Sequence, residues 1–330
     1  MIRSLPEYPA TFRDRNRWIV ARRGQRNEVD PSIPYACLRE QERDAKGELS
    51  EVATVFLTNR ECPWKCFMCD LWQNTLERSV GQGDIPKQID RAFESLALPT
   101  SVEERQAFQV KLYNSGSYFD PKAVPPEDDP AVAERVKGFS RVIVESHPRL
   151  IGERCLRFHE RLEPSLEVAM GLETACPEAL RSLNKGFELD DFRRSCGLLR
   201  REGISIRVFL LVNGPFVAAD QQREWTRASV MWAADAGAEV ICLIPTRQES
   251  GALATLSQRP GMVKTTLEQL EAAMDDALVS VESRVFADLW DLEQFSDCSI
   301  CLSARRERLI EMNHRQVVLE RVRCPACFDG

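Results

Sequence analysis

The sequence predicts an α/β fold, a partial parallel (β/α)6 barrel with a small four-cysteine appendage at its C-terminal end. Short β-rich runs alternate with longer amphipathic stretches through the middle of the chain, which is typical of strand-helix-strand units. Several runs, such as residues 208–212, are almost continuously apolar, as strands buried on both faces of a parallel sheet are. The appendage is indicated by two close cysteine pairs, Cys298 with Cys301 and Cys324 with Cys327.

The candidate elements follow one another in a regular order. Candidate strands lie at residues 52–58, 108–113, 140–145, 166–172, 204–212 and 239–245. Candidate helices lie at residues 85–96, 131–137, 151–162, 177–183, 190–202, 220–236 and 265–277. Residues 281–292 could form a seventh strand or a helix. We therefore expect an arginine-rich extension over residues 1–50, the barrel over residues 51–292 and a metal-binding unit over residues 293–330.

The composition is that of an ordinary soluble protein, with 43% apolar and 29% charged residues. No stretch approaches the ~20 apolar residues of a membrane span, and the charged N-terminus lacks a signal-peptide core. We therefore expect a cytoplasmic protein with no membrane contact. A net charge of -7 argues against a surface coated in basic residues. Both ends are nonetheless rich in arginine, nine in residues 1–43 and six in residues 302–326, which could bind phosphate or simply face solvent.

The loop after the first candidate strand carries three cysteines, Cys62, Cys66 and Cys69. In parallel barrels the functional residues lie where strands end, so this loop is placed where chemistry is expected. Three thiolates on one loop can ligate three irons of a 4Fe-4S cluster and leave the fourth iron open to substrate or cofactor. Spacing alone leaves a zinc site or simple burial as alternatives.

The two cysteine pairs near the C-terminus predict a second metal site. Four thiolates suit a tetrahedral zinc ion, which would be structural because no coordination position stays open. The 22 residues between the pairs predict a β-hairpin, with strands at 308–312 and 316–322 around a turn at 313–315, as in a zinc ribbon. Zinc is favoured over a second iron-sulfur cluster, which can also use such pairs.

Polar or glycine-containing segments end the other candidate strands. They lie at residues 112–121, 144–148, 169–174, 183–187 and 212–216. Together with the loop from Cys62 to Cys69, of sequence CPWKCFMC, these segments resemble the radical S-adenosylmethionine (SAM) superfamily. Within it they resemble the branch of the archaeosine synthase radical-SAM subunit and, more distantly, the catalytic subunit of Elongator. The resemblance covers about residues 50–250.

The resemblance implies a site made of the cysteine loop and the neighbouring strand ends. Cys62, Cys66 and Cys69 would ligate a 4Fe-4S cluster whose fourth iron binds SAM. Many family members have a glycine-glycine-glutamate motif for the SAM amino group, and its place is taken here by Ser115, Gly116 and Ser117, without the glutamate. The other implied cofactor-binding residues are Glu145 and Ser146 for the ribose or methionine, Arg207 for the carboxylate, and Glu173 for orienting cofactor or substrate. As residue types alone, Arg207 and Glu173 could equally form an ion pair with one another.

The resemblance also implies the reaction. SAM would be cleaved reductively to a 5′-deoxyadenosyl radical that abstracts hydrogen from a substrate, with electrons from a donor such as a flavodoxin or ferredoxin. The first substrate hypothesis is a modified tRNA nucleoside, because the resembling families act there and the arginine-rich ends could bind phosphate. The second is a small molecule or peptide in a biosynthetic pathway. The third is a non-enzymatic metal-binding adaptor, against which the intact cysteine triad argues.

Overall fold

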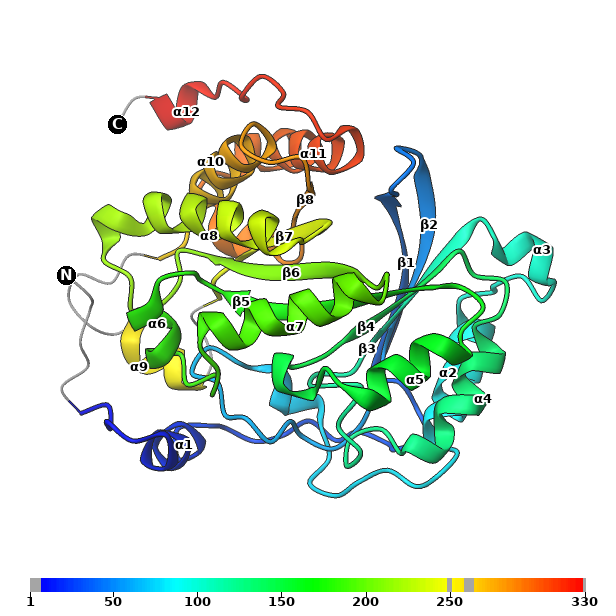
Figure 1. Cartoon of the computed structure of the whole chain (residues 1–330). Coiled ribbons are helices and arrows are strands. Elements are labelled where there is room, and N and C mark those ends of the chain that lie inside the picture. The colour runs from blue at the N-terminus through cyan, green and yellow to red at the C-terminus, as the bar shows by residue number, and fades with distance from the viewer. Residues whose placement is uncertain (1–6, 248–250, 258–263, 329–330) are drawn as a thin grey trace.

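The computed structural model describes residues 7–247, 251–257 and 264–328 and is built around one sheet of eight strands (Figure 1). The strands are β1 (Ala36–Arg43), β2 (Leu49–Phe56), β3 (Phe108–Tyr113), β4 (Arg141–Glu145), β5 (Ser165–Glu173), β6 (Ser205–Val212), β7 (Val240–Pro245) and β8 (Arg284–Ala287). They lie in the sheet in chain order, β1 antiparallel to β2 and every later pair parallel. Among the described residues β8 does not pair with β1, so the barrel stays open along that side.

The prediction of an incomplete parallel α/β barrel is confirmed. The six predicted strands are β2 to β7, and the undecided residues 281–292 contain a strand, β8. One strand was not predicted: β1 lies within residues 1–50, expected to form an extension, and belongs to the same sheet. The sheet therefore continues by one strand at each side of the predicted six.

Helices cover the outer face of the sheet (Figure 1). Seven of them match the predicted ones: α2 (Asp84–Ser95), α4 (Asp129–Arg135), α5 (Glu153–Arg161), α6 (Pro177–Ser182), α7 (Leu189–Arg201), α8 (Gln222–Ala236) and α10 (Leu267–Leu278). The others are α1 (Phe12–Val20), α3 (Val102–Arg105), α9 (Gly251–Ser257), α11 (Ser299–Arg315) and α12 (Pro325–Phe328). No helix in the described residues is long and apolar enough to cross a membrane.

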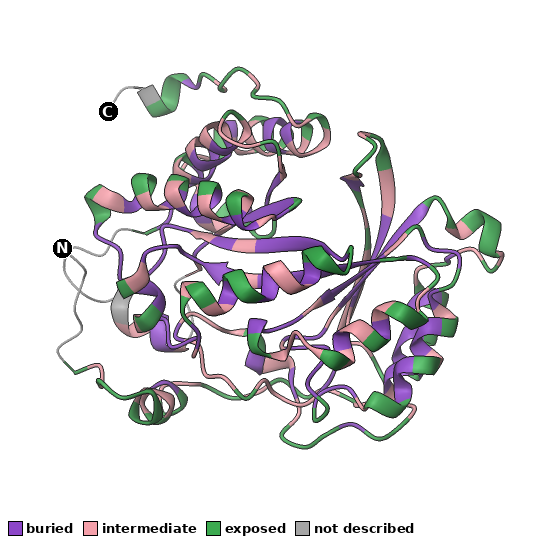
Figure 2. Ribbon diagram, in the orientation of Figure 1, coloured by how far each residue is buried: buried purple, intermediate pink, exposed green. Residues whose placement is uncertain are grey.

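The two faces of the sheet differ in chemistry because successive side chains of a strand point to opposite sides. On β3, Val110 and Leu112 are fully buried under the helices, in the main hydrophobic core. The residues between and after them, Lys111 and Tyr113, are turned to the inner face. The same alternation runs through the other parallel strands, which appear as buried ribbon in Figure 2. The inner face is therefore free to carry polar and aromatic groups.

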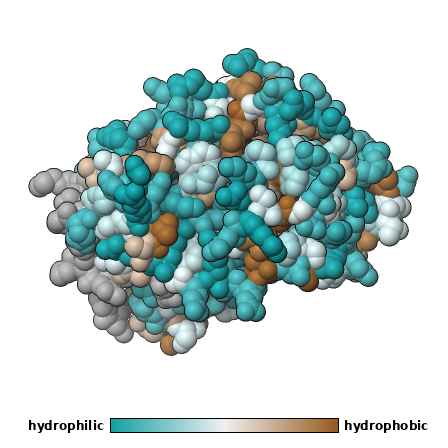
Figure 3. All heavy atoms as spheres, turned by 90° about the horizontal axis from the view of Figure 1, so that it is seen from below, coloured by the Kyte–Doolittle hydropathy of each residue, from teal (hydrophilic) through white to brown (hydrophobic). Residues whose placement is uncertain are grey.

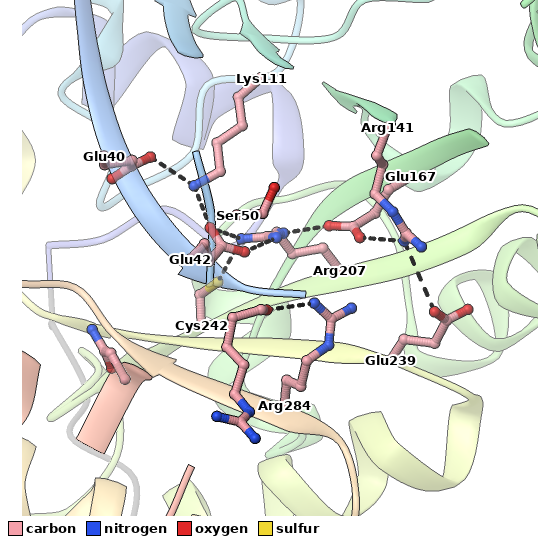
Figure 4. Close-up of polar contacts among 12 residues, drawn as sticks. Glu40, Glu42, Ser50, Lys111, Arg141, Glu167, Arg207, Glu239, Cys242 and Arg284 are labelled. Atoms are coloured by element: carbon pink, nitrogen blue, oxygen red, sulfur yellow. Dashed lines mark hydrogen bonds and ion pairs between the residues drawn. The ribbon is translucent and has the colours of Figure 1, made fainter. Parts of the chain in front are cut away.

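A network of buried ion pairs fills the inner face (Figure 4). Arg207 Nε lies 2.5 Å from Glu167 Oε1, and its Nη2 pairs with Glu42 on β1. Lys111 Nζ lies 2.5 Å from Glu42 Oε2, and Arg141 Nη1 lies 2.8 Å from Glu167 Oε2. Burial opposes the ionisation of Glu42, but the Arg207 and Lys111 charges hold its pKa well below the usual range. The acidic residues of β1 thus neutralise cations on β3 and β6.

Helix α11 lies along the open side of the barrel and contacts both outer strands. The Asn313 side chain accepts from Ala287 N at 2.8 Å and donates to Ala287 O at 3.0 Å. The Gln316 side chain accepts from Val285 N at 2.6 Å and donates to Val285 O at 2.8 Å. On the other side, Arg43 of β1 donates to His314 O at 3.0 Å. Side-chain amides therefore take the hydrogen bonds on β8 that a further strand would have taken.

The predicted β-hairpin between the two cysteine pairs is wrong. Residues 308–315 belong to helix α11, and residues 316–323 have no regular secondary structure. Arg308, buried within the helix, binds the returning segment through Leu319 O at 2.7 Å and helix α10 through Asp275 at 2.5 Å. The helix and the segment after it therefore bring the two cysteine pairs together without a hairpin.

Candidate functional site

The three cysteines of the loop lie at the carboxyl end of β2, as the sequence predicted. Burial raises the pKa of the Cys62 thiol to about 12, and it also raises the pKa of Cys66 and of Cys69. Left to themselves these thiols would stay protonated, because a buried thiolate needs a neighbouring positive charge. The donor set therefore fits a group that brings its own positive charge, such as an iron-sulfur cluster.

The N-terminal segment is fastened to this loop by one carboxylate. Glu61, directly before Cys62, pairs with Arg23 at 2.6 Å and also with Arg26 and Lys65. Burial opposes its ionisation, but the hydrogen bonds from these cations lower its pKa to about 2. Helix α1 lies below the sheet in Figure 1, and its Trp18 ring stacks on Phe67 of the loop with centroids 5.9 Å apart. The segment is therefore a strap held against the cysteine loop.

A second loop holds the backbone on both sides of Cys66. Leu183 O accepts from Phe67 N at 2.9 Å, and the Asn184 side chain donates to Lys65 O at 2.8 Å. Asn184 has a φ of 61°, in the left-handed region that asparagine tolerates better than most residues. These two bonds fix the position of Cys66 in the loop.

A buried ion pair follows in the same loop. Lys185 Nζ lies 2.6 Å from Glu173 Oε1, and both residues are less than a tenth exposed. The space they occupy depends on Gly171, where a Cβ would stand 2.3 Å from Glu173 Oε1 and 2.9 Å from Lys185 Nζ. Burial opposes the charge of Lys185, but Glu173 and then Cys66 raise its pKa above the usual value. The lysine therefore remains an ammonium beside the cysteine loop.

The predicted Ser115-Gly116-Ser117 loop lies against Cys62. A Cβ on Gly116 would be 3.4 Å from the Cys62 Cβ, an ordinary contact distance that shows how near the two loops lie. The Ser115 hydroxyl lies 2.8 Å from the Tyr35 hydroxyl, and the Ser117 hydroxyl accepts from His147 N at 2.8 Å. The sequence correctly placed this loop beside the cysteines.

Glu145 organises the start of that loop. Its carboxylate accepts from Asn114 N at 2.9 Å. Burial raises the pKa of Glu145 to about 7, against the backbone N–H groups of Asn114, Ser115 and Gly116, which lower it. Ser146, the next residue, is buried, and its N–H donates to Ala169 O at 2.9 Å on β5. Glu145 and Ser146 therefore lie with the serine loop at the carboxyl ends of the strands.

His147 connects the two sides of the site. Its ring stacks on Trp64 of the cysteine loop, with centroids 3.5 Å apart and planes within 6°. Arg149 N donates to Nδ1 at 3.2 Å, so the proton is on Nε2, which donates to Lys185 O at 2.8 Å. Burial lowers the pKa of His147 to about 3, and the ring is neutral. This histidine holds the cysteine loop and the Lys185 loop together.

Strained backbone gathers at this end of the sheet. Four non-glycine residues with a positive φ lie at or just after the ends of parallel strands, Ser115, Glu173, Asn213 and Phe216, and a fifth, Asn184, follows helix α6. Such conformations cost of order 1–3 kcal/mol each and are found mainly where function requires them. Four of the five strained residues therefore lie at the carboxyl ends of the strands, together with the cysteine loop and the polar segments.

The structure does not bring Arg207 to this edge. Arg207 is the third of the eight residues of β6, counted from the end of the strand opposite to the cysteine loop. Its guanidinium is fully used by Glu42 and Glu167, so the predicted role in binding a carboxylate of SAM is corrected to an ion pair inside the barrel. The alternative pairing of Arg207 with Glu173 is also wrong, because Glu173 pairs with Lys185.

Several residues of the site were not predicted. Asn184 and Lys185 lie in a segment that the sequence marks as polar, but its residues are equally those of a helix end. No sequence pattern marks Tyr35 or Glu61 as a site residue, because only folding brings Tyr35 to Ser115 and Glu61 to Arg23.

Aromatic rings line the inner face next to the ion-pair network. Half-exposed rings contact one another from Tyr35 to Phe56 at 5.6 Å, from Phe56 to Tyr113 at 6.1 Å and from Tyr113 to Phe209 at 6.0 Å. Trp290, after β8, adds an exposed ring 5.5 Å from Phe56. Flat apolar groups can stack on such rings.

The arginines at the two ends of the chain are largely bound within the protein. In the N-terminal segment Arg15 donates to Arg181 O at 2.6 Å, and Arg22 lies over the Trp18 ring at 3.6 Å. In the C-terminal part Arg305 pairs with Glu271 at 2.6 Å. Seen from the side of α1, the surface is mostly hydrophilic, with hydrophobic side chains in separate patches (Figure 3). The arginines contribute less free positive charge than their number suggests.

The four cysteines of the appendage gather as predicted. Their sulfur atoms all lie within 4.8 Å of one another. Cys298 Sγ is 3.9 Å from Cys324 Sγ, and Cys301 Sγ is 3.7 Å from Cys327 Sγ. One pair begins helix α11 and the other flanks and enters α12. The group is of the size that binds a single metal ion.

Two curated proteins are similar to this chain in sequence. The sequence is 26% identical over 190 residues to archaeosine synthase subunit beta of Methanosarcina acetivorans, which covers 54% of this chain and 53% of that protein. It is 23% identical over 202 residues to an uncharacterised protein of Methanocaldococcus jannaschii, which covers 58% and 55%. The chain thus spans about half the length of the curated relatives it matches. No protein-family model matches the sequence.

Among solved structures, two share the fold at a TM-score of 0.50 and 15% identity. One is archaeal Elp3 of Methanocaldococcus infernus, with 74% of this chain and 60% of that one covered. The other is methylornithine synthase (PylB), with 84% and 76% covered. With this barrel, this cysteine loop and these relatives, the chain resembles the radical SAM superfamily, in the branch of archaeosine synthase and Elp3.

Proposed function

We propose that the protein is a radical SAM enzyme. A 4Fe-4S cluster on Cys62, Cys66 and Cys69 would pass an electron, received from a donor such as a flavodoxin or ferredoxin, to SAM and so supply a 5′-deoxyadenosyl radical for hydrogen abstraction. The observation that carries this proposal is the position of the cysteine loop at the carboxyl end of β2, held on one side by Glu61 and on the other by Leu183 and Asn184. A loop held in this way keeps three thiols in place for one cluster.

We further propose that the serine loop binds SAM. Ser115, Gly116 and Ser117 lie beside Cys62, and in place of the missing glutamate they offer hydroxyls and backbone groups to the SAM amino group. Glu145 and Ser146, at the carboxyl end of β4, would bind the ribose or the methionine part of SAM. Glu173 would act through its ion pair with Lys185. Arg207 has no part in this set.

Reconstitution under anaerobic conditions tests the chemistry. Wild-type protein, loaded with iron and sulfide and reduced with dithionite, should form 5′-deoxyadenosine from SAM, whereas Cys66→Ala should not. Cys37→Ala is the matched control, because Cys37 lies on β1 outside both cysteine groups, and it should behave as wild type. A wild-type protein that binds iron but never cleaves SAM would contradict the proposal and favour a metal-binding adaptor.

For the substrate we propose a modified nucleoside in tRNA. Support comes from the similarity to archaeosine synthase subunit beta, over about half of each chain. The half-exposed rings of the inner face add support, because nucleobases stack on aromatic side chains. Binding of bulk tRNA should then be measurable and should weaken steeply as salt rises.

A second candidate substrate is a small molecule or peptide of a biosynthetic pathway. The observation that favours it is the internal pairing of the terminal arginines, which leaves fewer of them for phosphate. The measurement of tRNA binding at rising salt concentration decides between the two candidate substrates. Absence of salt-dependent tRNA binding by the reconstituted enzyme would favour the small substrate.

We infer that the four-cysteine group binds one zinc ion rather than a second cluster. Four thiolates around a zinc ion at about 2.3 Å in a tetrahedron stand about 3.8 Å apart. The sulfur distances of 3.7 and 3.9 Å in the structure fit this value. In a 4Fe-4S cluster each cysteine binds a different iron, which spreads the sulfurs further apart. Metal analysis should give one zinc per chain in wild type and none in Cys301→Ser, and iron in this group would contradict the inference.

A further inference from the structure

Trp290 lies at the open side of the barrel, in the loop that follows β8. The residue is 48% exposed, although tryptophan is mostly buried in folded proteins. Its ring contacts Phe56, the last residue of β2, with centroids 5.5 Å apart and planes at 65°. The contact therefore bridges the side on which, among the described residues, β8 and β1 do not pair.

Polar contacts hold the backbone of Trp290 from both sides. Its N–H donates to Asp288 Oδ1 at 3.1 Å, and Arg247 Nη2 donates to its carbonyl oxygen at 2.9 Å. Arg247 Nη2 also lies 3.0 Å from Asp288 Oδ2, so an ion pair joins the two groups that hold the backbone. Asp291 follows with a φ of 53°, in the left-handed region that aspartate tolerates better than most residues. An aromatic ring on a backbone fixed in this way loses little conformational freedom when a ligand stacks on it.

A row of rings connects Trp290 with the serine loop. Phe56 contacts Tyr35 with centroids 5.6 Å apart, and the Tyr35 hydroxyl lies 2.8 Å from the Ser115 hydroxyl. Both rings between Trp290 and the loop are half-buried. A flat group that stacks on Trp290 is therefore separated by only two side chains from the loop proposed to bind SAM.

The inner face fits a flat ligand better than a charged one. Tyr113 and Phe209 contact each other with centroids 6.0 Å apart, although β4 and β5 lie between their strands in the sheet. The two rings stand two residues beyond Lys111 and Arg207 on the same strands, so they lie between the ion pairs and the carboxyl ends. The cations below are already neutralised by carboxylates. Recognition at this face therefore depends on stacking, which suits a nucleobase or a similar heteroaromatic ring and not a phosphate.

We propose that Trp290 determines the specificity of the enzyme by stacking its exposed ring on the base of the substrate. The inference rests on the proposed function and deepens it, because it names the residue that binds the base of the proposed nucleoside. SAM also carries a base, adenine, so the two ligands must be measured separately.

Dissociation constants of the reconstituted, unreduced enzyme test the proposal, with bulk tRNA and SAM as separate probes at a fixed ionic strength. We expect Trp290→Ala to bind tRNA about 5- to 100-fold more weakly than wild type, the range for loss of one stack between a base and an aromatic ring. Trp290→Phe keeps a flat ring and should recover most of this loss, and both variants should bind SAM as wild type does. Equal tRNA binding by wild type and Trp290→Ala overturns the inference. Weaker binding of SAM overturns it as well, because Trp290 would then bind adenine or support the fold.

Tryptophan fluorescence separates stacking from a structural role. A base stacked on an indole ring quenches its emission, so saturating bulk tRNA should reduce the emission of wild type by more than that of Trp290→Phe. Trp232→Phe is the matched control, because Trp232 is half-buried on helix α8, which covers the outer face of the sheet. Its loss should leave the quenching by tRNA unchanged. Equal quenching of Trp290→Phe and wild type overturns the inference.

SAM cleavage separates this inference from the proposed function. A wild-type chain that forms no 5′-deoxyadenosine contradicts the proposed chemistry, whereas tRNA binding by the Trp290 variants still decides the inference, since it requires no reduction. A wild-type chain that cleaves SAM but binds no tRNA contradicts the proposed substrate and the inference with it. A chain that cleaves SAM and binds tRNA equally with and without the Trp290 ring contradicts only the inference.

Discussion

At the scale of single residues, Gly171 makes the clearest demand on the sequence. Its missing side chain leaves the space that Glu173 and Lys185 fill. Gly171→Ala should therefore displace the ion pair and lower the free energy of unfolding by about 1–3 kcal/mol, as overpacking of a core does. Urea unfolding of the two proteins measures this difference.

Gly214→Ala is the matched control for that substitution. A Cβ at Gly214 would be 3.6 Å from the Leu211 Cβ, an ordinary contact. Its free energy of unfolding should stay within about 1 kcal/mol of wild type, since alanine at a compatible position is neutral or mildly stabilising. Equal losses in both variants would mean that Gly171 matters for its backbone and not for the space beside it.

Glu145 predicts a pH dependence of stability. Burial raises its pKa from 4.5 to about 7 in the folded chain, so the folded state keeps a proton that the unfolded state has lost between these values. The contribution of this group to stability is complete below the unfolded pKa and is lost as the pH rises through about 7. Glu145→Gln should remove that loss. Urea midpoints on both sides of the folded pKa check it, and identical pH profiles for the two proteins would contradict the assignment.

At the scale of elements, the N-terminal strap depends on Glu61. Glu61→Gln weakens the bonds to Arg23, Arg26 and Lys65 at once. We expect a loss of about 1.5–3 kcal/mol in the free energy of unfolding, the range for hydrogen bonds to charged groups. Trypsin should also cleave after Arg22, Arg23 or Arg26 sooner than in wild type.

Glu51→Gln provides the comparison, because Glu51 pairs with Arg39 at 3.9 Å on the exposed face of β1 and β2. Such surface pairs contribute about 1 kcal/mol or less. Cleavage of Glu61→Gln at the wild-type rate would mean that the aromatic contacts of α1 hold the strap by themselves.

The elements that the sequence predicted are those with a hydrophobic reason to form. Strands β2 to β7 carry apolar residues at the fully buried positions that pack against the helices, and that pattern is visible without a structure. Strand β1 was not predicted because charged residues such as Glu42 lie on its inner face. The charge of Glu42 is compensated there by Arg207 and Lys111, which are distant in the sequence. The hairpin was predicted in place of α11 because residues 313–315 look like a turn, although they end a helix whose buried residues include Leu309 and Met312.

The candidate site was predictable to the extent that it is local in sequence. The cysteine loop and the serine loop are each a few adjacent residues, so their composition identifies them. Arg207 could have been placed correctly, since it stands near the start of its predicted strand and functional residues follow the ends of strands. The pairing of Lys185 with Glu173 joins residues from different loops, and nothing in residue type distinguishes it from a pairing with Arg207.

At the scale of the whole molecule, the four cysteines and α11 form one unit across the open side of the barrel. The helix is capped by Cys298 at its N-terminus and by Gln316, which binds β8, at its C-terminus. Loss of the metal in Cys301→Ser should therefore loosen the helix and speed hydrogen exchange at the backbone of Val285 and Ala287. Mass spectrometry of peptides that contain these residues measures the effect.

Arg323→Ala is the matched control for this experiment. Arg323 is exposed, lies next to Cys324 and pairs with Glu320 at 3.6 Å on the surface, so its loss should leave metal content and exchange unchanged. A metal-free Cys301→Ser protein with wild-type exchange at β8 would show that Arg308 and the amide contacts alone keep α11 in place.

The side-chain amide contacts on β8 also affect the tendency of the protein to aggregate. A strand at the end of a sheet offers its free backbone groups to strands of other molecules, a common route to aggregation. On β8 the backbone groups of Val285 and Ala287 are already taken by Gln316 and Asn313 of the same chain. An added strand would have paired with β8 but would itself have exposed unpaired backbone groups at the edge of the sheet. Helix α11 binds β8 through its side chains, so it ends the sheet without exposing another strand edge.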